Sequence, residues 1–66
     1  MTEYHAGDIV EMLVAGKIVD RGSIVSLVDN RETGVQILTI DWQNSGRLTQ
    51  MLGELRKKGA VQASGL

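Results

Sequence analysis

The stretch "DWQNSGRLTQMLGELRKKG", Asp41–Gly59, decides the fold because it fits two secondary structures. As a helix ending before Gly59, it aligns its large apolar side chains at i, i+3, i+4 and i+7, namely Leu48, Met51, Leu52 and Leu55. As a hairpin, it has an "NSG" loop with glycine in the left-handed position, a strand through Leu48 and Gln50, and a turn at "GEL". Gly53 costs a helix about 1 kcal/mol relative to alanine, which weakens the helical pattern without excluding it.

The segment before this stretch predicts an antiparallel hairpin. The runs "GSIVSLVDN" (22–30) and "GVQILTIDW" (34–42) are rich in β-branched residues, and "DNRETG" between them supplies turn residues. In the second run, Val35 and Ile37 fall on one face, and Leu38, Ile40 and Trp42 fall on the other. Apolar residues on both faces indicate a small closed barrel or a sheet packed under helices. The first apolar segment, "DIVEMLVA" (8–15), fits a strand and a helix equally well.

The size and composition predict a single domain over residues 1–66 with a thin core. A chain of 66 residues buries only about 60% of the surface that its unfolded form exposes. With no cysteine and one histidine, His5, the chain lacks disulfides and cannot build a closed zinc site alone. We place the core at residues 7–59, with tails at 1–6 and 60–66. Contacts with other copies or with a larger assembly are then the expected source of additional stability.

Charge is unevenly distributed, although the net charge is only −1. Residues 1–42 hold seven acidic and three basic side chains, and residues 43–66 hold one acidic and four basic ones. This distribution lacks the strongly basic surface of a typical nucleic-acid binder and suits contacts between copies at least as well.

The chain resembles small SH3-like barrels of the tudor and KOW type, of the kind found as short proteins in tailed phages. The matching motifs are "GDIVEM" (7–12), "GSIVSLVD" (22–29), "ILTIDW" (37–42), "SGRLT" (45–49) and "ELRKKG" (54–59). The resemblance implies a mainly β fold of about five short strands and a phage-encoded protein. Methyl-lysine cages and polyproline grooves need several aromatic residues, and this chain has only Tyr4 and Trp42. The family's ligand sites are therefore not expected here.

A second resemblance favours a different architecture. The order "MLVAGKIV", hairpin, "SGRLTQMLGEL" is similar to the α-β-β-α order of small phage head–tail joining proteins. It implies an α+β fold in a helix–hairpin–helix order, with a C-terminal helix at 46–58. We keep the SH3-like barrel as the main prediction and this fold as its alternative.

The candidate partner-binding residues are Trp42, Arg47, Arg56, Lys57 and Lys58. Tryptophan is a frequent interface anchor, although Trp42 at the end of a strand also fits a core or rim position. The four basic residues could contact protein or phosphate, and the last three also fit a solvated end of a helix or strand.

No catalytic, cofactor-binding or metal-binding residue is assigned. Asp8, Glu11, Asp20 and Asp29 are expected to be spread over strand ends and turns, and the glycines do not match a phosphate-binding loop. We therefore expect a non-enzymatic interaction or assembly protein without a cofactor, which forms a homo-oligomer or docks into a larger assembly. The alternative is a nucleic-acid-binding or host-regulatory small barrel that uses the C-terminal basic residues. With no apolar run long enough to cross a membrane and no signal-peptide pattern, we expect no membrane partner and a location in the host cytoplasm or the virion.

Overall fold

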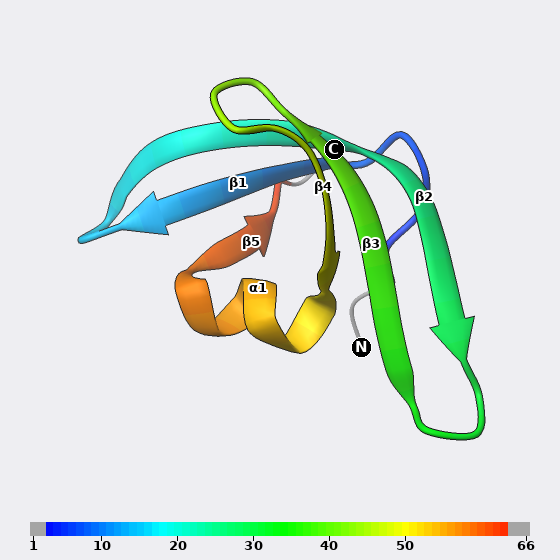
Figure 1. The fold of residues 1–66 in the computed structure, drawn as a ribbon. Helices are drawn as coiled ribbons and strands as arrows, with labels where there is room; N and C mark the ends of the chain where they lie inside the picture. Colours follow the sequence, from blue (N-terminus) through cyan, green and yellow to red (C-terminus); the bar gives the residue numbers. More distant parts are fainter. Residues whose placement is uncertain (1–2, 64–66) are drawn as a thin grey trace.

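The computed structural model describes residues 3–63, which form five antiparallel strands and one short helix (Figure 1). The elements, in chain order, are β1 (Ile9–Val14), β2 (Lys17–Asn30), β3 (Val35–Trp42), β4 (Gly46–Met51), α1 (Leu52–Lys58) and β5 (Ala60–Gln62). The strands make one sheet in the order β4-β3-β2-β1-β5, so β4 and β5 are its two edges. The expected mainly β fold is confirmed. The sheet is open, with α1 joining one edge to the other.

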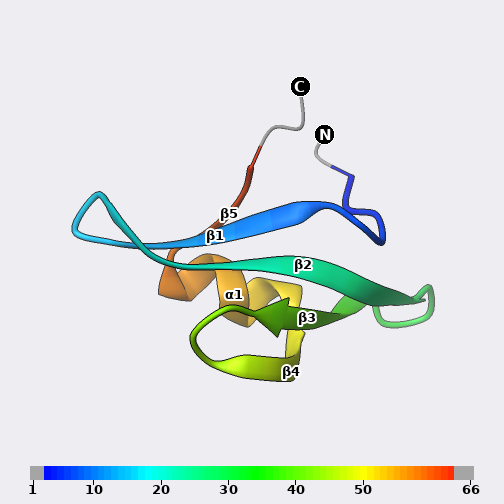
Figure 2. The same ribbon diagram turned by 90° about the horizontal axis from the view of Figure 1, so that it is seen from above.

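The long strand β2 connects the two halves of the sheet. Its first part pairs with β1 and its last part pairs with β3, and Gly22 is opposite Val10 on one side and Trp42 on the other. Figure 2 shows β2 running between β1 and β3. A Cβ atom at Gly22 would lie 2.6 Å from Ile40 Cγ2 and 3.0 Å from Trp42 Cε3. Glycine at this position therefore lets β3 side chains pack directly against the β2 backbone.

The core lies between the inner face of the sheet and α1. Its buried apolar residues come from every element except β4, together with the segment before β1: Tyr4, Val10, Ile24, Leu38, Ile40, Trp42, Leu52, Leu55 and Ala60. The face of β3 that holds Leu38, Ile40 and Trp42 is the inner one, and Val35 and Ile37 on the outer face are half-buried. The predicted hairpin of β2 and β3, with its two apolar faces, is confirmed.

The stretch Asp41–Gly59 turns out to be part strand and part helix. The loop glycine is confirmed, because Gly46 has a φ of 80°, and the following residues continue as β4 in regular register with β3. The predicted turn at "GEL" is wrong, because Leu52–Lys58 forms α1. The alternative helix over 46–58 is wrong for its first half, since pairing with β3 supplies the backbone hydrogen bonds there. Of the four apolar residues at helical spacing, only Leu52 and Leu55 lie in a helix, and both side chains are buried.

The segment "DIVEMLVA", which fits a strand and a helix equally well in sequence, forms β1, because Ile9–Val14 pairs with β2 and Val10–Met12 also pairs with β5. The predicted tails, residues 1–6 and 60–66, are too long at both ends. Tyr4 is in the core, and Ala60–Gln62 forms β5 against Val10–Met12. The remaining tail positions 1–2 and 64–66 lie outside the described residues.

Gly59 joins the end of α1 to β1. It has a φ of 110°, its N–H donates to the Arg56 carbonyl oxygen, and its own carbonyl oxygen accepts from the Leu13 N–H at 3.1 Å. A Cβ atom at this position would collide with the Leu13 carbonyl oxygen. The glycine that the sequence indicates as a helix stop is thus also the point at which the chain turns back onto the sheet.

Two glycine-to-alanine substitutions test this role. Gly59→Ala is expected to lower the free energy of unfolding by about 2 kcal/mol or more, because a left-handed backbone and a steric collision penalise the new Cβ together. Gly53→Ala is the matched control within α1, where an added Cβ meets nothing within 4 Å. It is expected to raise the free energy of unfolding by about 0.5–1 kcal/mol. Urea unfolding measures both changes, and equal effects at the two positions would contradict the assignment.

Candidate functional site

The basic candidates occupy two separate places. Arg47 lies at the start of β4, where its Nη2 atom is 3.8 Å from Asp41 Oδ2. Arg56, Lys57 and Lys58 lie in the last turn of α1, beyond the far end of β4, and the Arg56 guanidinium is 5.6 Å from the centre of the Tyr4 ring. Because each strand residue advances the chain by about 3.3 Å, the length of β4 separates Arg47 from the α1 group. The structure does not bring the four residues into one patch.

Trp42 lies inside the molecule. Only 5% of its surface is exposed, and its Nε1–H donates to Gln50 Oε1 at 3.1 Å. Its ring packs close to Gly22. These contacts support the core role that the sequence left open, and they leave little of the ring free for a partner.

Exposed apolar side chains gather at the connection of β1 and β2. We call Val14, Ile18 and Val19 the hairpin tip; their exposed fractions are 55%, 51% and 49%. In Figure 2 this connection extends beyond the rest of the molecule, on the side away from the β2–β3 turn. The sequence predicts no role for these residues. The available signal was that "LVAGKIV" is apolar on both sides of a two-residue turn, without the alternation of a strand that has one solvent-facing side.

The turn of the hairpin tip is strained. Ala15 and Gly16 connect Val14 to Lys17 with φ values of 51° and 78°, so both central residues are left-handed, as a type I′ turn requires. Alanine is unfavourable there, whereas asparagine tolerates this backbone.

The substitution Ala15→Asn is therefore expected to raise the free energy of unfolding by about 0.5–1 kcal/mol, since it relieves the strain without adding a core contact. Thermal unfolding followed by circular dichroism measures the change. Ala15→Val serves as the control and should destabilise the chain, because a β-branched side chain fits a positive φ less well than alanine does.

A second apolar group crosses the outer face of the sheet. We call Val28, Ile37 and Met51 the outer row; the register places Val28 opposite Ile37 and Ile37 opposite Met51 on three adjacent strands. Val28 is 60% exposed and Met51 is 46% exposed. Beside this row, the hydroxyl oxygens of Thr39 and Thr49 lie 3.1 Å apart. The outer face near the β4 edge is therefore a mixed apolar and hydroxyl surface with few charges.

The buried carboxylate of Asp20 holds the β3–β4 turn in place. Oδ1 accepts from the N–H groups of Arg21 at 2.8 Å and Asn44 at 3.0 Å, and Oδ2 accepts from the Ser45 hydroxyl at 2.8 Å. Burial tends to raise the pKa of Asp20, but these hydrogen bonds outweigh burial and hold the pKa below its ordinary value. From the sequence, Asp20 is one of several carboxylates expected to be spread over strand ends and turns. In the structure its two oxygens bind the β3–β4 turn to β2.

The pH dependence of stability tests this role. Because the folded chain lowers the pKa of Asp20, its contribution is fully present above about pH 4, where an unfolded aspartate is also ionised. It is lost as the pH falls through the lower pKa of the folded state. Asp20→Asn should therefore lower the midpoint of thermal unfolding at pH 7 and lower it less at pH 3. Asp29→Asn, an exposed change on the same strand, is the control. An equal effect of Asp20→Asn at both pH values would contradict the assignment.

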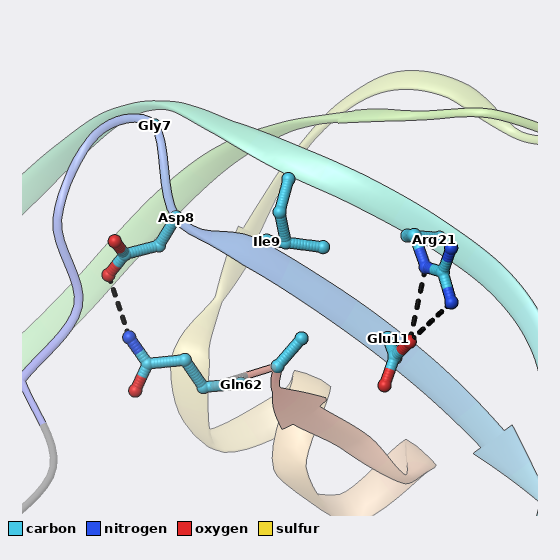
Figure 3. Close-up of a pocket in the computed structure, with 7 residues that line it drawn as sticks. Gly7, Asp8, Ile9, Glu11, Arg21 and Gln62 are labelled. Carbon is cyan, nitrogen blue, oxygen red and sulfur yellow. Dashed lines mark hydrogen bonds and ion pairs between the residues drawn. The ribbon is translucent and has the colours of Figure 1, made fainter. Parts of the chain in front are cut away.

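A shallow hollow lies beside β1, between the Gly7–Asp8 turn and the end of β5 (Figure 3). On one side, Glu11 Oε2 accepts from Arg21 Nη2 at 2.7 Å and Nε at 3.1 Å. On the other side, Asp8 Oδ2 accepts from Gln62 Nε2 at 2.7 Å and from the His5 N–H at 2.8 Å. The charged groups of this hollow thus hold the N-terminal segment, β1, β2 and β5 together.

Within residues 3–63, no three His, Cys, Asp or Glu side chains are grouped closely enough to hold a metal ion. Over the same residues, no helix has the length and apolar character needed to cross a membrane. Comparisons with models of protein families, with curated proteins and with solved structures gave no match to this chain. The functional assignment therefore depends on the geometry of the molecule itself.

Proposed function

We propose that this chain is a non-enzymatic assembly protein of the SH3-like barrel type that acts through protein contacts, including contacts between copies of itself. The observation that carries the proposal is the exposed hairpin tip. Val14, Ile18 and Val19 are each about half exposed at the end of a projecting hairpin, and they contribute nothing to the buried core. Apolar residues face solvent on both sides of this hairpin, since Val14 lies opposite Lys17 and Ile18 lies opposite Leu13. Exposed apolar surface is typical of sites that another protein covers.

The barrel assignment is supported by the sheet order and by the shape of β2. A strand that pairs with β1 in its first part and with β3 in its last part lets one sheet curve over both sides of a single core. The edges β4 and β5 are joined by α1, whose Leu52 and Leu55 are buried in the core. The sequence resemblance to small barrels of tailed phages supports a phage origin, and with it a location in the host cytoplasm or the virion.

The limited size of the core also supports this proposal. Nine large apolar side chains among the described residues are at least 39% exposed, and nine apolar residues are buried. Covering the exposed ones would contribute about 25 cal/mol per Å² of apolar surface removed from water. Association thus provides the stabilisation that a chain of 66 residues cannot obtain from its own interior.

Nucleic-acid binding is the competing function, and it depends on Arg47, Arg56, Lys57 and Lys58. Their separation into two places weakens it, because phosphate affinity grows with the number of phosphates that one surface contacts. Arg56 and Arg47 also have neighbours within the chain, the Tyr4 ring and Asp41.

Sedimentation velocity over a range of protein concentrations distinguishes these functions. We expect an oligomer whose dissociation constant changes little between about 50 and 200 mM salt, since apolar contacts are not screened. Duplex DNA should not change the sedimentation profile. A complex with DNA that weakens steeply over this salt range would support the competing function. A monomer at all concentrations, with or without DNA, would overturn both.

A further inference from the structure

The edge strand β4 is an open pairing surface. Within residues 3–63 it pairs only with β3, and Figure 2 shows it at the margin of the molecule. Natural sheets protect such edges with proline, lysine, bulges or very short strands. β4 has six residues, "GRLTQM", with no proline or lysine, one charged side chain and an unbroken register with β3. The other edge, β5, has only three residues.

The backbone groups of β4 that face away from β3 can be identified. The Gln43 N–H donates to the Arg21 carbonyl oxygen of β2. Residues alternate along a strand, so Asp41 and Thr39 also face β2, whereas Trp42, Ile40 and Leu38 face β4. Their register partners Gly46, Leu48 and Gln50 therefore bond to β3. This alternation directs the N–H and C=O groups of Arg47 and Thr49 and the N–H of Met51 outward, whereas the C=O of Met51, the N-cap residue, accepts the first hydrogen bond within α1.

We propose that β4 pairs antiparallel with β4 of a second copy, about a twofold axis at Thr49. A twofold contact between identical strands is self-complementary, and in this register the outward N–H groups of Thr49 and Met51 meet outward C=O groups of the partner strand. Thr49 is opposite the partner's Thr49, Arg47 is opposite the partner's Met51, and Leu48 is opposite the partner's Gln50. The two sheets then form one continuous sheet.

The side chains of β4 fit a second copy in this register. The only charged residue, Arg47, does not face the partner's Arg47, so no like charges are opposed. The methylenes of the arginine cover the partner's Met51, which is 46% exposed in the single chain. Leu48, which is 40% exposed, gains the aliphatic part of the partner's Gln50. The outer rows of both copies then lie on one face of the joined sheet.

This inference deepens the proposed function and rests on it, because it names the surface through which copies associate. The two are separable by experiment. If the wild-type chain never associates, both fail. If it associates but the edge strand is not involved, only the edge assignment fails.

The first test replaces the residue at the axis. Thr49→Pro removes the outward N–H and places a proline ring against the partner strand. The single chain should still fold, because proline is tolerated in an edge strand when its N–H side faces solvent. Sedimentation equilibrium should show a dissociation constant of the dimer at least about tenfold higher than that of the wild type. Thr49→Ala is the matched control: it also loses the hydroxyl contact with Thr39 but keeps the N–H, and it should dimerise nearly as the wild type does. Unchanged dimerisation of a folded Thr49→Pro variant would overturn the inference.

The second test does not depend on how proline is tolerated. The chain contains no cysteine, so a single introduced thiol reports one position. Opposite residues of an antiparallel pair have Cα atoms about 5.5 Å apart, within the range of a disulfide. Mild oxidation of Thr49→Cys should give a disulfide-linked dimer at least about tenfold faster than oxidation of Ser26→Cys. Ser26 is exposed and lies in the same row of the sheet, two strands from the edge. Equal rates of the two variants would overturn the inference.

Discussion

The close contact of β3 side chains with the backbone of β2 at Gly22 is the constraint on which the structure depends. Gly22 is the residue at which β2 pairs with β1 and β3 simultaneously, and Ile40 and Trp42 occupy the space that any side chain there would need. One bent strand therefore serves both halves of the sheet. Without this contact, the β1–β5 half and the β3–β4 half would have no shared core, and a chain of this length could not stabilise two.

The small core also leaves many apolar side chains on the surface. The interior holds apolar residues between the sheet and α1, and the polar contacts beside it hold turns and chain ends in place. Asp20 fastens the β3–β4 turn, and Asp8 connects the N-terminal segment to Gln62 of β5. Exposed apolar side chains are present at three places: the hairpin tip, the outer row and the edge of β4. In our proposal, these are the surfaces through which the chain contacts other chains.

Local patterns predicted the elements whose signals are contained in a few residues. The β2–β3 hairpin, its inner face at Leu38, Ile40 and Trp42, and the loop glycine at Gly46 all follow from β-branched alternation and turn chemistry. Other features depend on residues distant in sequence. The hydroxyl of Ser45 donates to Asp20 of β2, which lies 25 positions earlier in the chain. The exposure of the hairpin tip could not be predicted, because an apolar run in a sequence does not indicate whether another element covers it.

The sequence by itself determined a mainly β chain with too few aromatic residues for a methyl-lysine cage or a polyproline groove and with Gly59 as a helix stop. Only the tertiary structure decided that Asp41–Gly59 is divided at Met51 between a strand and a helix. The physical reason is that the strand is selected by hydrogen bonds to β3, whereas the helix is selected by the burial of Leu52 and Leu55 beneath the sheet. Both interactions exist only once residues distant along the chain have come together.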